Sequence, residues 1–166
     1  MTLRLAGIVN DSITDGPGIR LAVFGQGCPH KCGGCHNPDA LDPLGGYDCG
    51  AEEIAETAAA NPLLDGVTFT GGEPFAQAVG FAWLGRRIKE RVPGLTVITY
   101  TGYTWEELDS LPGARELIEI SDFIVDGRYD AGLKSLDLMH KGSGNQRFID
   151  VKKTLEQGNV VLWTNC

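Results

Sequence analysis

The segment "IRLAVFGQGCPHKCGGCHN", residues 19–37, joins an apolar stretch to a loop that is rich in cysteine. Residues 19–25 carry β-branched and aromatic side chains and end in glycine, which predicts a β-strand. The loop that follows places Cys28, Cys32 and Cys35 within eight residues, in the spacing C-x3-C-x2-C. Three thiols clustered in this way favour a metal or redox site over disulfide bonds.

Apolar strands and amphipathic helices alternate along the rest of the chain. We expect further strands over residues 66–72, 95–102, 122–127 and 159–164. Helices are predicted over 51–61, 76–92 and 116–121, and Thr104 with Glu107 forms the pattern of a capping box. This alternation predicts a parallel sheet with helices on its faces, and the length of 166 residues suits a single domain spanning residues 1–166.

Residues with unusual chemistry follow the predicted strands. The cysteine loop, residues 28–37, comes after the first strand, and "GGE" (71–73) comes after the strand that starts at residue 66. "TGY" (101–103) and Asp126 stand at the ends of the next two strands. Because chemistry in parallel α/β folds collects at the carboxyl ends of the strands, these four segments are expected to meet on one rim.

Composition excludes several classes of partner. Fourteen Lys and Arg against 22 Asp and Glu give a net charge of −8, without a basic cluster for nucleic acid. No apolar run approaches the ~20 residues of a membrane span, and the N-terminal apolar stretch is too short for a secretory signal. We therefore expect a cytoplasmic protein that binds neither nucleic acid nor membrane. Cys49 and Cys166 stand outside the cluster and are expected to be ordinary thiols.

The cysteine loop has too few obvious ligands for a closed zinc site, because neither His30 nor His36 gives a familiar zinc spacing. Thiolates also bind iron–sulfur clusters, and a 4Fe–4S cube takes one thiolate per iron. Three cysteines would leave one iron open to a small chelating ligand. A ferredoxin-like electron carrier, in which Cys49 completes the cluster, is the non-enzymatic alternative.

The cysteine spacing resembles that of the radical S-adenosylmethionine (SAM) superfamily. The resemblance implies a partial, open (β/α) barrel of about five or six parallel strands. It also implies a 4Fe–4S cluster held by Cys28, Cys32 and Cys35, with SAM bound to the remaining iron. Many members carry an aromatic residue before the last cysteine. This chain has Gly34 there, as the ribonucleotide reductase activators do.

The motif "DGPGIR" (15–20) narrows the resemblance to the glycyl-radical-enzyme activases, and its glycines permit backbone conformations that other residues resist. The second half of the chain is similar to the activating enzyme of anaerobic ribonucleoside-triphosphate reductase, through "TYTGYTWEEL" (99–108), "FIVDGRYD" (123–130) and "HKGSGNQR" (140–147). The resemblance covers roughly residues 8–150. It implies that a 5′-deoxyadenosyl radical generates a glycyl radical on that reductase, with a flavodoxin-type protein as the electron donor.

Binding residues are also implied by the resemblance. Within "TGGEP" (70–74), two glycines let the backbone approach a ligand, and Glu73 accepts hydrogen bonds from the ammonium group of SAM. Taken alone, this turn is equally typical of a strand-to-helix connection. The expected SAM-binding residues are Gly34, Cys35, His36, Asn37, Gly71, Gly72, Glu73, Asp126 and Arg128. No general acid–base pair is expected, so no residue is assigned as catalytic.

Two enzymatic alternatives remain. The first is an activase for another glycyl-radical enzyme, such as pyruvate formate-lyase. Those activases are longer, and they carry an acidic residue where this chain has Thr99. The second is a radical SAM enzyme with a small-molecule substrate, such as a deazaguanine synthase.

Overall fold

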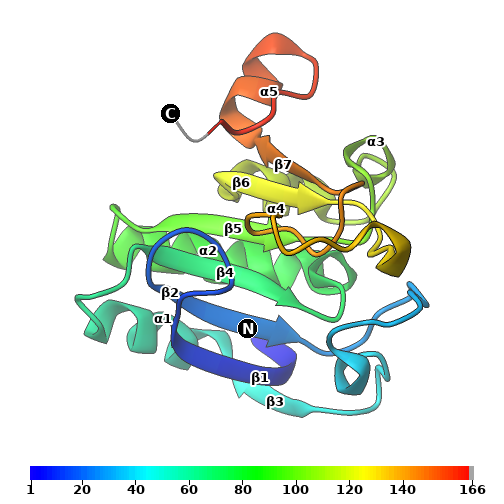
Figure 1. Cartoon of the computed structure of the whole chain (residues 1–166). Helices are drawn as coiled ribbons and strands as arrows, with labels where there is room; N and C mark the ends of the chain where they lie inside the picture. Colours follow the sequence, from blue (N-terminus) through cyan, green and yellow to red (C-terminus); the bar gives the residue numbers. More distant parts are fainter. Residues whose placement is uncertain (165–166) are drawn as a thin grey trace.

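The structure is a computed structural model that describes residues 1–164, so Cys166 lies outside the described residues. One seven-stranded sheet runs through it in the order β3-β1-β2-β4-β5-β6-β7 (Figure 1). The strands are β1 (Thr2–Ser12), β2 (Arg20–Gly25), β3 (Tyr47–Gly50), β4 (Gly66–Gly71), β5 (Thr96–Tyr100), β6 (Phe123–Asp126) and β7 (Arg147–Asp150).

The centre of the sheet is parallel. Strands β2, β4, β5 and β6 pair in that order, with Val23 opposite Phe69 and Phe69 opposite Thr99. The outer pairs β1–β2, β1–β3 and β6–β7 are antiparallel, and the sheet ends at β3 and β7 without closing. The predicted open α/β barrel is therefore confirmed. The expected five or six parallel strands are corrected to seven strands with antiparallel outer pairs.

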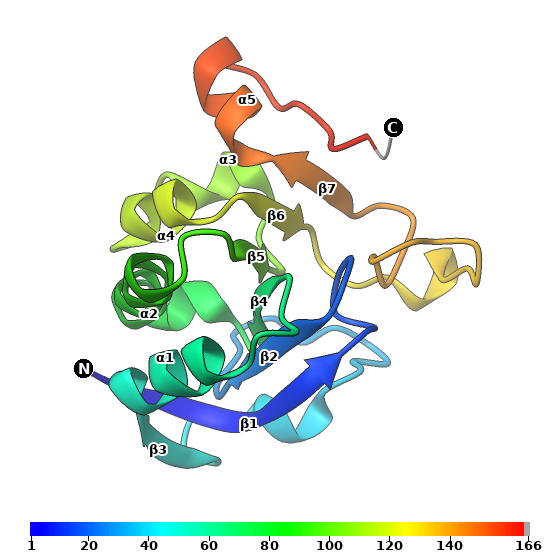
Figure 2. The same ribbon diagram turned by 90° about the vertical axis from the view of Figure 1, so that its left-hand side faces the viewer.

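Helices cover one face of this sheet. The helices are α1 (Ala51–Ala60), α2 (Ala78–Arg91), α3 (Trp105–Leu108), α4 (Ala114–Ile120) and α5 (Val151–Gln157), with 3-10 turns η1 (Pro38–Ala40), η2 (Pro74–Gln77) and η3 (Ala131–Leu133). Figure 2 shows α1, α2 and α4 side by side against the sheet, with η3 and its loops on the opposite side. The alternation of strands and helices predicts helices on the faces of the sheet, and in the structure loops cover the second face.

Alternation along β5 illustrates the two faces. Val97 belongs to the main hydrophobic core beneath the helices, where Phe69 and Phe81 contact each other with ring centroids 4.9 Å apart. Ile98, the next residue, packs on the opposite face with Val125. Because successive strand residues point to opposite faces, one strand contributes to both the core and the face that carries the site.

The boundaries of some elements differ from the prediction. Residues 159–164 do not form a strand, and only Leu162 makes a single bridge, to Ile149. The capping box of Thr104 and Glu107 is present at the start of α3. Among the helices of residues 1–164, none combines the length and the apolar character that a membrane span requires.

Candidate functional site

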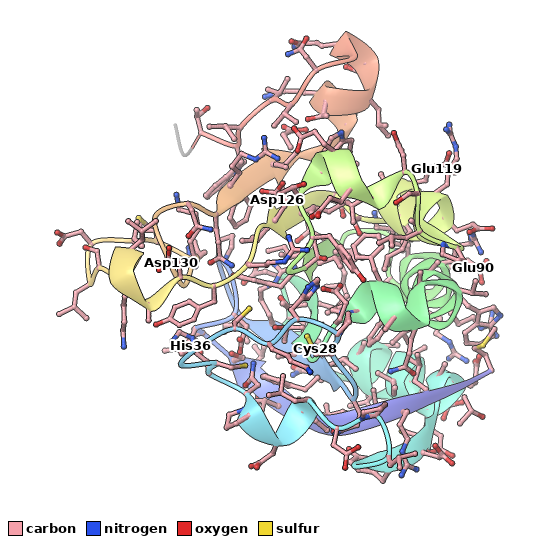
Figure 3. All side chains as sticks on the ribbon, turned by 90° about the vertical axis from the view of Figure 1, so that its right-hand side faces the viewer. Cys28, His36, Glu90, Glu119, Asp126 and Asp130 are labelled. Atoms are coloured by element: carbon pink, nitrogen blue, oxygen red, sulfur yellow. The ribbon has the colours of Figure 1, made fainter. Side chains whose placement is uncertain are left out.

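The cysteine loop begins directly after β2, and its two ends are held together. The backbone N–H of Gly27 donates to the carbonyl of Ala40 at 2.8 Å, and that of Cys28 donates to Leu41 at 3.1 Å. These bonds close the loop around η1, whose Pro38 occupies the first turn. The loop therefore has a defined shape at the carboxyl end of β2, where Figure 3 shows Cys28 and His36.

The three clustered thiols are half-buried and free of disulfides. The backbone N–H of Asn37 donates to the Cys35 sulfur at 3.4 Å, which fixes the chain directly after the last cysteine. Burial raises the pKa of the Cys28 thiol to about 11, so a bound metal must displace its proton.

The donor set fits a 4Fe–4S cluster better than a single ion. No three His, Cys, Asp or Glu side chains among residues 1–164 are arranged to hold one metal ion. A 4Fe–4S cube takes one thiolate per iron, so its cysteine ligands need not converge on one point. Cys28, Cys32 and Cys35 nevertheless line the same cavity.

The two-glycine turn after β4 packs on the residues that precede the cysteine loop. The N–H of Gly72 donates to the carbonyl of Gly25, and that of Glu73 donates to Gly27, both at 2.8 Å. A Cβ at Gly72 would lie 2.4 Å from the Gly27 carbonyl oxygen, and Gly71 has φ +95°. Both positions thus require glycine, because a side chain would push the turn away from the loop.

A cavity of about 620 Å³ lies at these strand ends, within the range of about 300–1,000 Å³ typical of small-molecule sites. Its wall includes the expected residues Cys35, His36, Asn37, Gly71 and Gly72. Of the other expected residues, Gly34, Glu73, Asp126 and Arg128 are not among the described residues that line it.

Asp126 and Arg128 have partners within the protein. The buried Asp126 carboxylate accepts hydrogen bonds from the Trp105 backbone at 2.7 Å and from the Arg147 guanidinium at 2.5 and 3.1 Å. Arg128 forms an ion pair with Glu107 at 3.0 Å. Asp126, labelled in Figure 3, thus caps the N-terminus of α3 and connects this helix to Arg147 at the start of β7. Their contact with SAM stays a prediction.

Glu73 lies behind the turn, with 1% of its surface exposed. Its carboxylate accepts a hydrogen bond from His30 Nε2 at 2.7 Å. It also accepts one from the Thr101 hydroxyl and one from the Gly102 N–H, both at 2.9 Å. The Glu73 carboxylate thereby joins three of the four segments that the sequence predicts on one rim.

Sequence reasoning missed part of the cavity wall. Tyr129 lines it and its ring lies 4.5 Å from that of His36, centroid to centroid. A Cβ at Gly34, which has φ +74°, would come within 3.7 Å of the Tyr129 ring. Tyr100 also lines the cavity and donates its hydroxyl to the His140 carbonyl at 2.7 Å. Tyr100 ends β5 and Tyr129 follows β6, so the rule that placed Asp126 on the rim could have found both.

The "DGPGIR" motif contributes one residue, Asp15, to the cavity wall. Arg20 is buried and donates to Thr68 Oγ1 and the Val67 carbonyl, each at 2.7 Å, and to the Pro17 carbonyl at 3.2 Å. Burial lowers the pKa of Arg20 to about 10, so the guanidinium is still charged at neutral pH. The loop that Arg20 anchors presents Asp15 to the cavity.

Comparison with known proteins matches residues 14–149 to the family model described as a 4Fe-4S single cluster domain. The pyruvate formate-lyase-activating enzyme of Clostridium pasteurianum is 33% identical over 166 residues, covering 96% of this chain. The chain spans only 66% of the length of that relative.

Two shorter relatives are matched over most of their length. The anaerobic ribonucleoside-triphosphate reductase-activating protein of Enterobacteria phage T4 is 32% identical, covering 80% of this chain and 85% of the relative. The protein of the same name from Escherichia coli K12 is 30% identical, covering 81% and 90%. Among solved structures, QueE from Escherichia coli superposes with a TM-score of 0.53 at 13% identity, covering 80% of this chain and 74% of that one, which shows a shared fold.

Proposed function

Because the chain belongs to the family of 4Fe-4S single cluster domains, among the glycyl-radical-enzyme activases of the radical SAM superfamily, we propose that it activates an anaerobic ribonucleoside-triphosphate reductase. The observation that carries the proposal is the cavity at the strand ends. Its wall combines all three clustered thiols with the two-glycine turn. The proposed partner is the reductase subunit that receives the glycyl radical.

When bound, the cluster supplies the electron that cleaves SAM into methionine and a 5′-deoxyadenosyl radical, which removes a hydrogen atom from a glycine of the partner. The residues of this chain hold the cluster and orient SAM. Cys28, Cys32 and Cys35 provide the thiolates, and the Asn37 N–H donates to the Cys35 sulfur. Gly71 and Gly72 bring bare backbone to the cavity wall, where it can approach SAM closely.

One observation favours the reductase as partner over pyruvate formate-lyase. Thr99 stands where formate-lyase activases carry an acid. It is buried, and its hydroxyl lies 2.8 Å from that of Ser121, so this position offers the cavity no carboxylate. We further propose a flavodoxin-type electron donor and a cytoplasmic location.

The test starts with protein reconstituted anaerobically with iron and sulfide. After reduction and addition of SAM, 5′-deoxyadenosine is measured by chromatography. We expect Cys32→Ala to abolish its formation, whereas Cys49→Ala, which changes a thiol on β3 outside the cysteine loop, retains it. A wild type that assembles a cluster without cleaving SAM, together with SAM cleavage gained in Cys49→Ala, would instead support the four-cysteine electron carrier.

The partner is tested by adding the anaerobic reductase to the reduced protein and SAM. We expect the electron paramagnetic resonance signal of a glycyl radical on the reductase. A radical on pyruvate formate-lyase with none on the reductase would reassign the partner, and consumption of a small molecule with neither radical would place the protein among the other radical SAM enzymes.

A further inference from the structure

The Glu73 carboxylate is fully occupied by donors from within the protein. Oε1 accepts from the Phe75 backbone N–H at 3.0 Å and from the Thr101 hydroxyl at 2.9 Å. Oε2 accepts from His30 Nε2 at 2.7 Å and from the Gly102 N–H at 2.9 Å. Because a carboxylate oxygen accepts about two hydrogen bonds, all four acceptor positions are taken.

This occupancy bears on the expected role of Glu73. An ammonium group of SAM would have to displace one of the four donors, and the displaced donor would stay buried without a partner. Glu73 has 1% of its surface exposed and is not among the described residues that line the cavity. Three of its donors, His30, Thr101 and Gly102, do line the cavity, so the carboxylate lies behind these residues in the cavity wall.

His30 is the member of this group that comes from the cysteine loop, between Cys28 and Cys32. It is 8% exposed, and its ring packs edge-on against Tyr103 at 4.4 Å between centroids. A Cβ at Gly102 would lie 2.3 Å from His30 Cδ2, so the imidazole fits only because residue 102 is glycine. The contact joins the cysteine loop to the turn after β4 and to the loop after β5.

We propose that His30, Glu73, Thr101 and Gly102 form a latch that holds the cysteine loop in the shape that receives the cluster. Glu73 is then a positioning residue that acts through His30 and not a ligand of SAM. This inference rests on the proposed function, because it assigns the roles of two residues in the same site. Its consequence is that a change at His30 and a change at Glu73 loosen the same loop.

The test compares His30→Ala, Glu73→Gln and the double variant, each reconstituted with iron and sulfide. The first readout is the rate at which a ferrous chelator removes iron, which does not require SAM or activity. We expect each single variant to lose iron at least about tenfold faster than the wild type, because a charged buried hydrogen bond is broken. The double variant is expected to fall well short of the product of the two single effects, since both single variants remove the same contact between His30 and Glu73.

Two further variants separate a specific latch from general damage to the fold. His30→Gln keeps a side-chain N–H donor and is expected to restore slow iron loss, while Lys31→Ala, at the exposed neighbouring position, matches the wild type. Iron loss from His30→Gln as fast as from His30→Ala would overturn the latch. Multiplication of the two single effects in the double variant would also overturn it.

The second readout is the dissociation constant of SAM in the variants that still hold a full cluster. The latch predicts that Glu73→Gln and His30→Gln bind SAM within about threefold of each other. If Glu73→Gln lost iron as slowly as the wild type but bound SAM much more weakly, Glu73 would be identified as a SAM ligand. If the wild-type protein failed to cleave SAM, the proposed function would fall, yet the comparison of iron loss would still decide the latch.

Discussion

At the scale of single residues, two glycines near the site differ sharply in what surrounds them. A Cβ at Gly72 would lie 2.4 Å from the Gly27 carbonyl oxygen and 2.8 Å from that of Ala40, and both are backbone atoms. Gly33, inside the cysteine loop, has nothing within 4 Å of the equivalent position. The first glycine is required by close packing of the backbone, and the second is not.

We predict that Gly72→Ala prevents stable assembly of the cluster, because the turn must move away from the residues that start the cysteine loop. The strain is expected to cost about 1–3 kcal/mol of stability. Iron and sulfide per chain after reconstitution, together with the thermal midpoint, measure both effects. Gly33→Ala is the matched control and is expected to load a full cluster, and equal iron in the two variants would refute the packing argument.

The sequence could group residues that stand close together along the chain. Cys28, Cys32 and Cys35 lie within one short loop, so they could be proposed as joint ligands without knowing the fold, and all three line the same cavity. His30 and Glu73 are 43 residues apart, and only the pairing of β2 with β4 brings them to 2.7 Å. Contacts of this kind depend on strand order and register, which a pattern along one chain does not specify.

At the scale of elements, Arg20 connects the loop between β1 and β2 to the parallel centre of the sheet. It reaches acceptors on β4 and on β5, where Thr96 accepts at 2.9 Å through its carbonyl. No ion pair of Arg20 with an acid occurs within the described chain, and the guanidinium is held by neutral oxygens.

We predict that Arg20→Met lowers the free energy of unfolding by about 2–4 kcal/mol, because several buried oxygens lose their donor. Arg20→Lys is expected to recover little of the loss, since an ammonium has three donors and lacks the planar fork. Urea denaturation measures both variants. A loss below about 0.5 kcal/mol for Arg20→Met, the range of an ordinary surface change, would show that the anchor contributes little.

A surface contact between α1 and α2 should depend on pH. Hydrogen bonds from Arg87 and Arg91 lower the pKa of Glu52 to about 2, from an ordinary value of 4.5. Because the pKa is lower in the folded protein, the contribution to stability is complete above pH 4.5 and is lost as the pH falls towards 2.

We predict that Glu52→Gln is less stable than the wild type at pH 6 and that the gap narrows as the pH falls below 4.5. The measurement is the urea midpoint of each protein without its cluster, taken at several pH values from pH 6 to below pH 4.5. The effect is expected to be small and to shrink in high salt, because the pair is exposed. A gap that does not change with pH would show that Glu52 acts through packing alone.

The elements that carry the site were predictable because their strands are buried on both faces and read as continuous apolar runs. β3 and β7 have four residues each, and β3 is largely exposed, so neither produces such a run. Residues 159–164 do read as a continuous apolar run. In the structure, however, the aromatic side chain of this segment packs against other rings and the segment does not form a strand. Trp163 lies 4.7 Å from Phe148 and 5.9 Å from Phe123, between ring centroids, while only one bridge joins this segment to the sheet.

At the scale of the whole molecule, the hydrophobic core and the cavity lie in different parts of the open sheet. The helices α1, α2 and α4 bury one face and supply the main core (Figure 2). The cavity lies at the carboxyl ends of the strands, and none of the described residues that line it belongs to these three helices. Alternation of strands and helices predicted the parallel centre and the rim. It did not predict the antiparallel outer strands or the face that the helices leave uncovered, because helical patterns do not state which side of a sheet they occupy.

The proposed function depends on a 4Fe–4S cluster that three cysteines hold with one iron free to bind SAM. The most direct measurement is the electron paramagnetic resonance spectrum of the anaerobically reconstituted, reduced protein, recorded before and after addition of SAM. We expect a reduced 4Fe–4S signal that changes when SAM is added. A 4Fe–4S signal that SAM leaves unaltered, or a protein that carries zinc in place of iron, would contradict it.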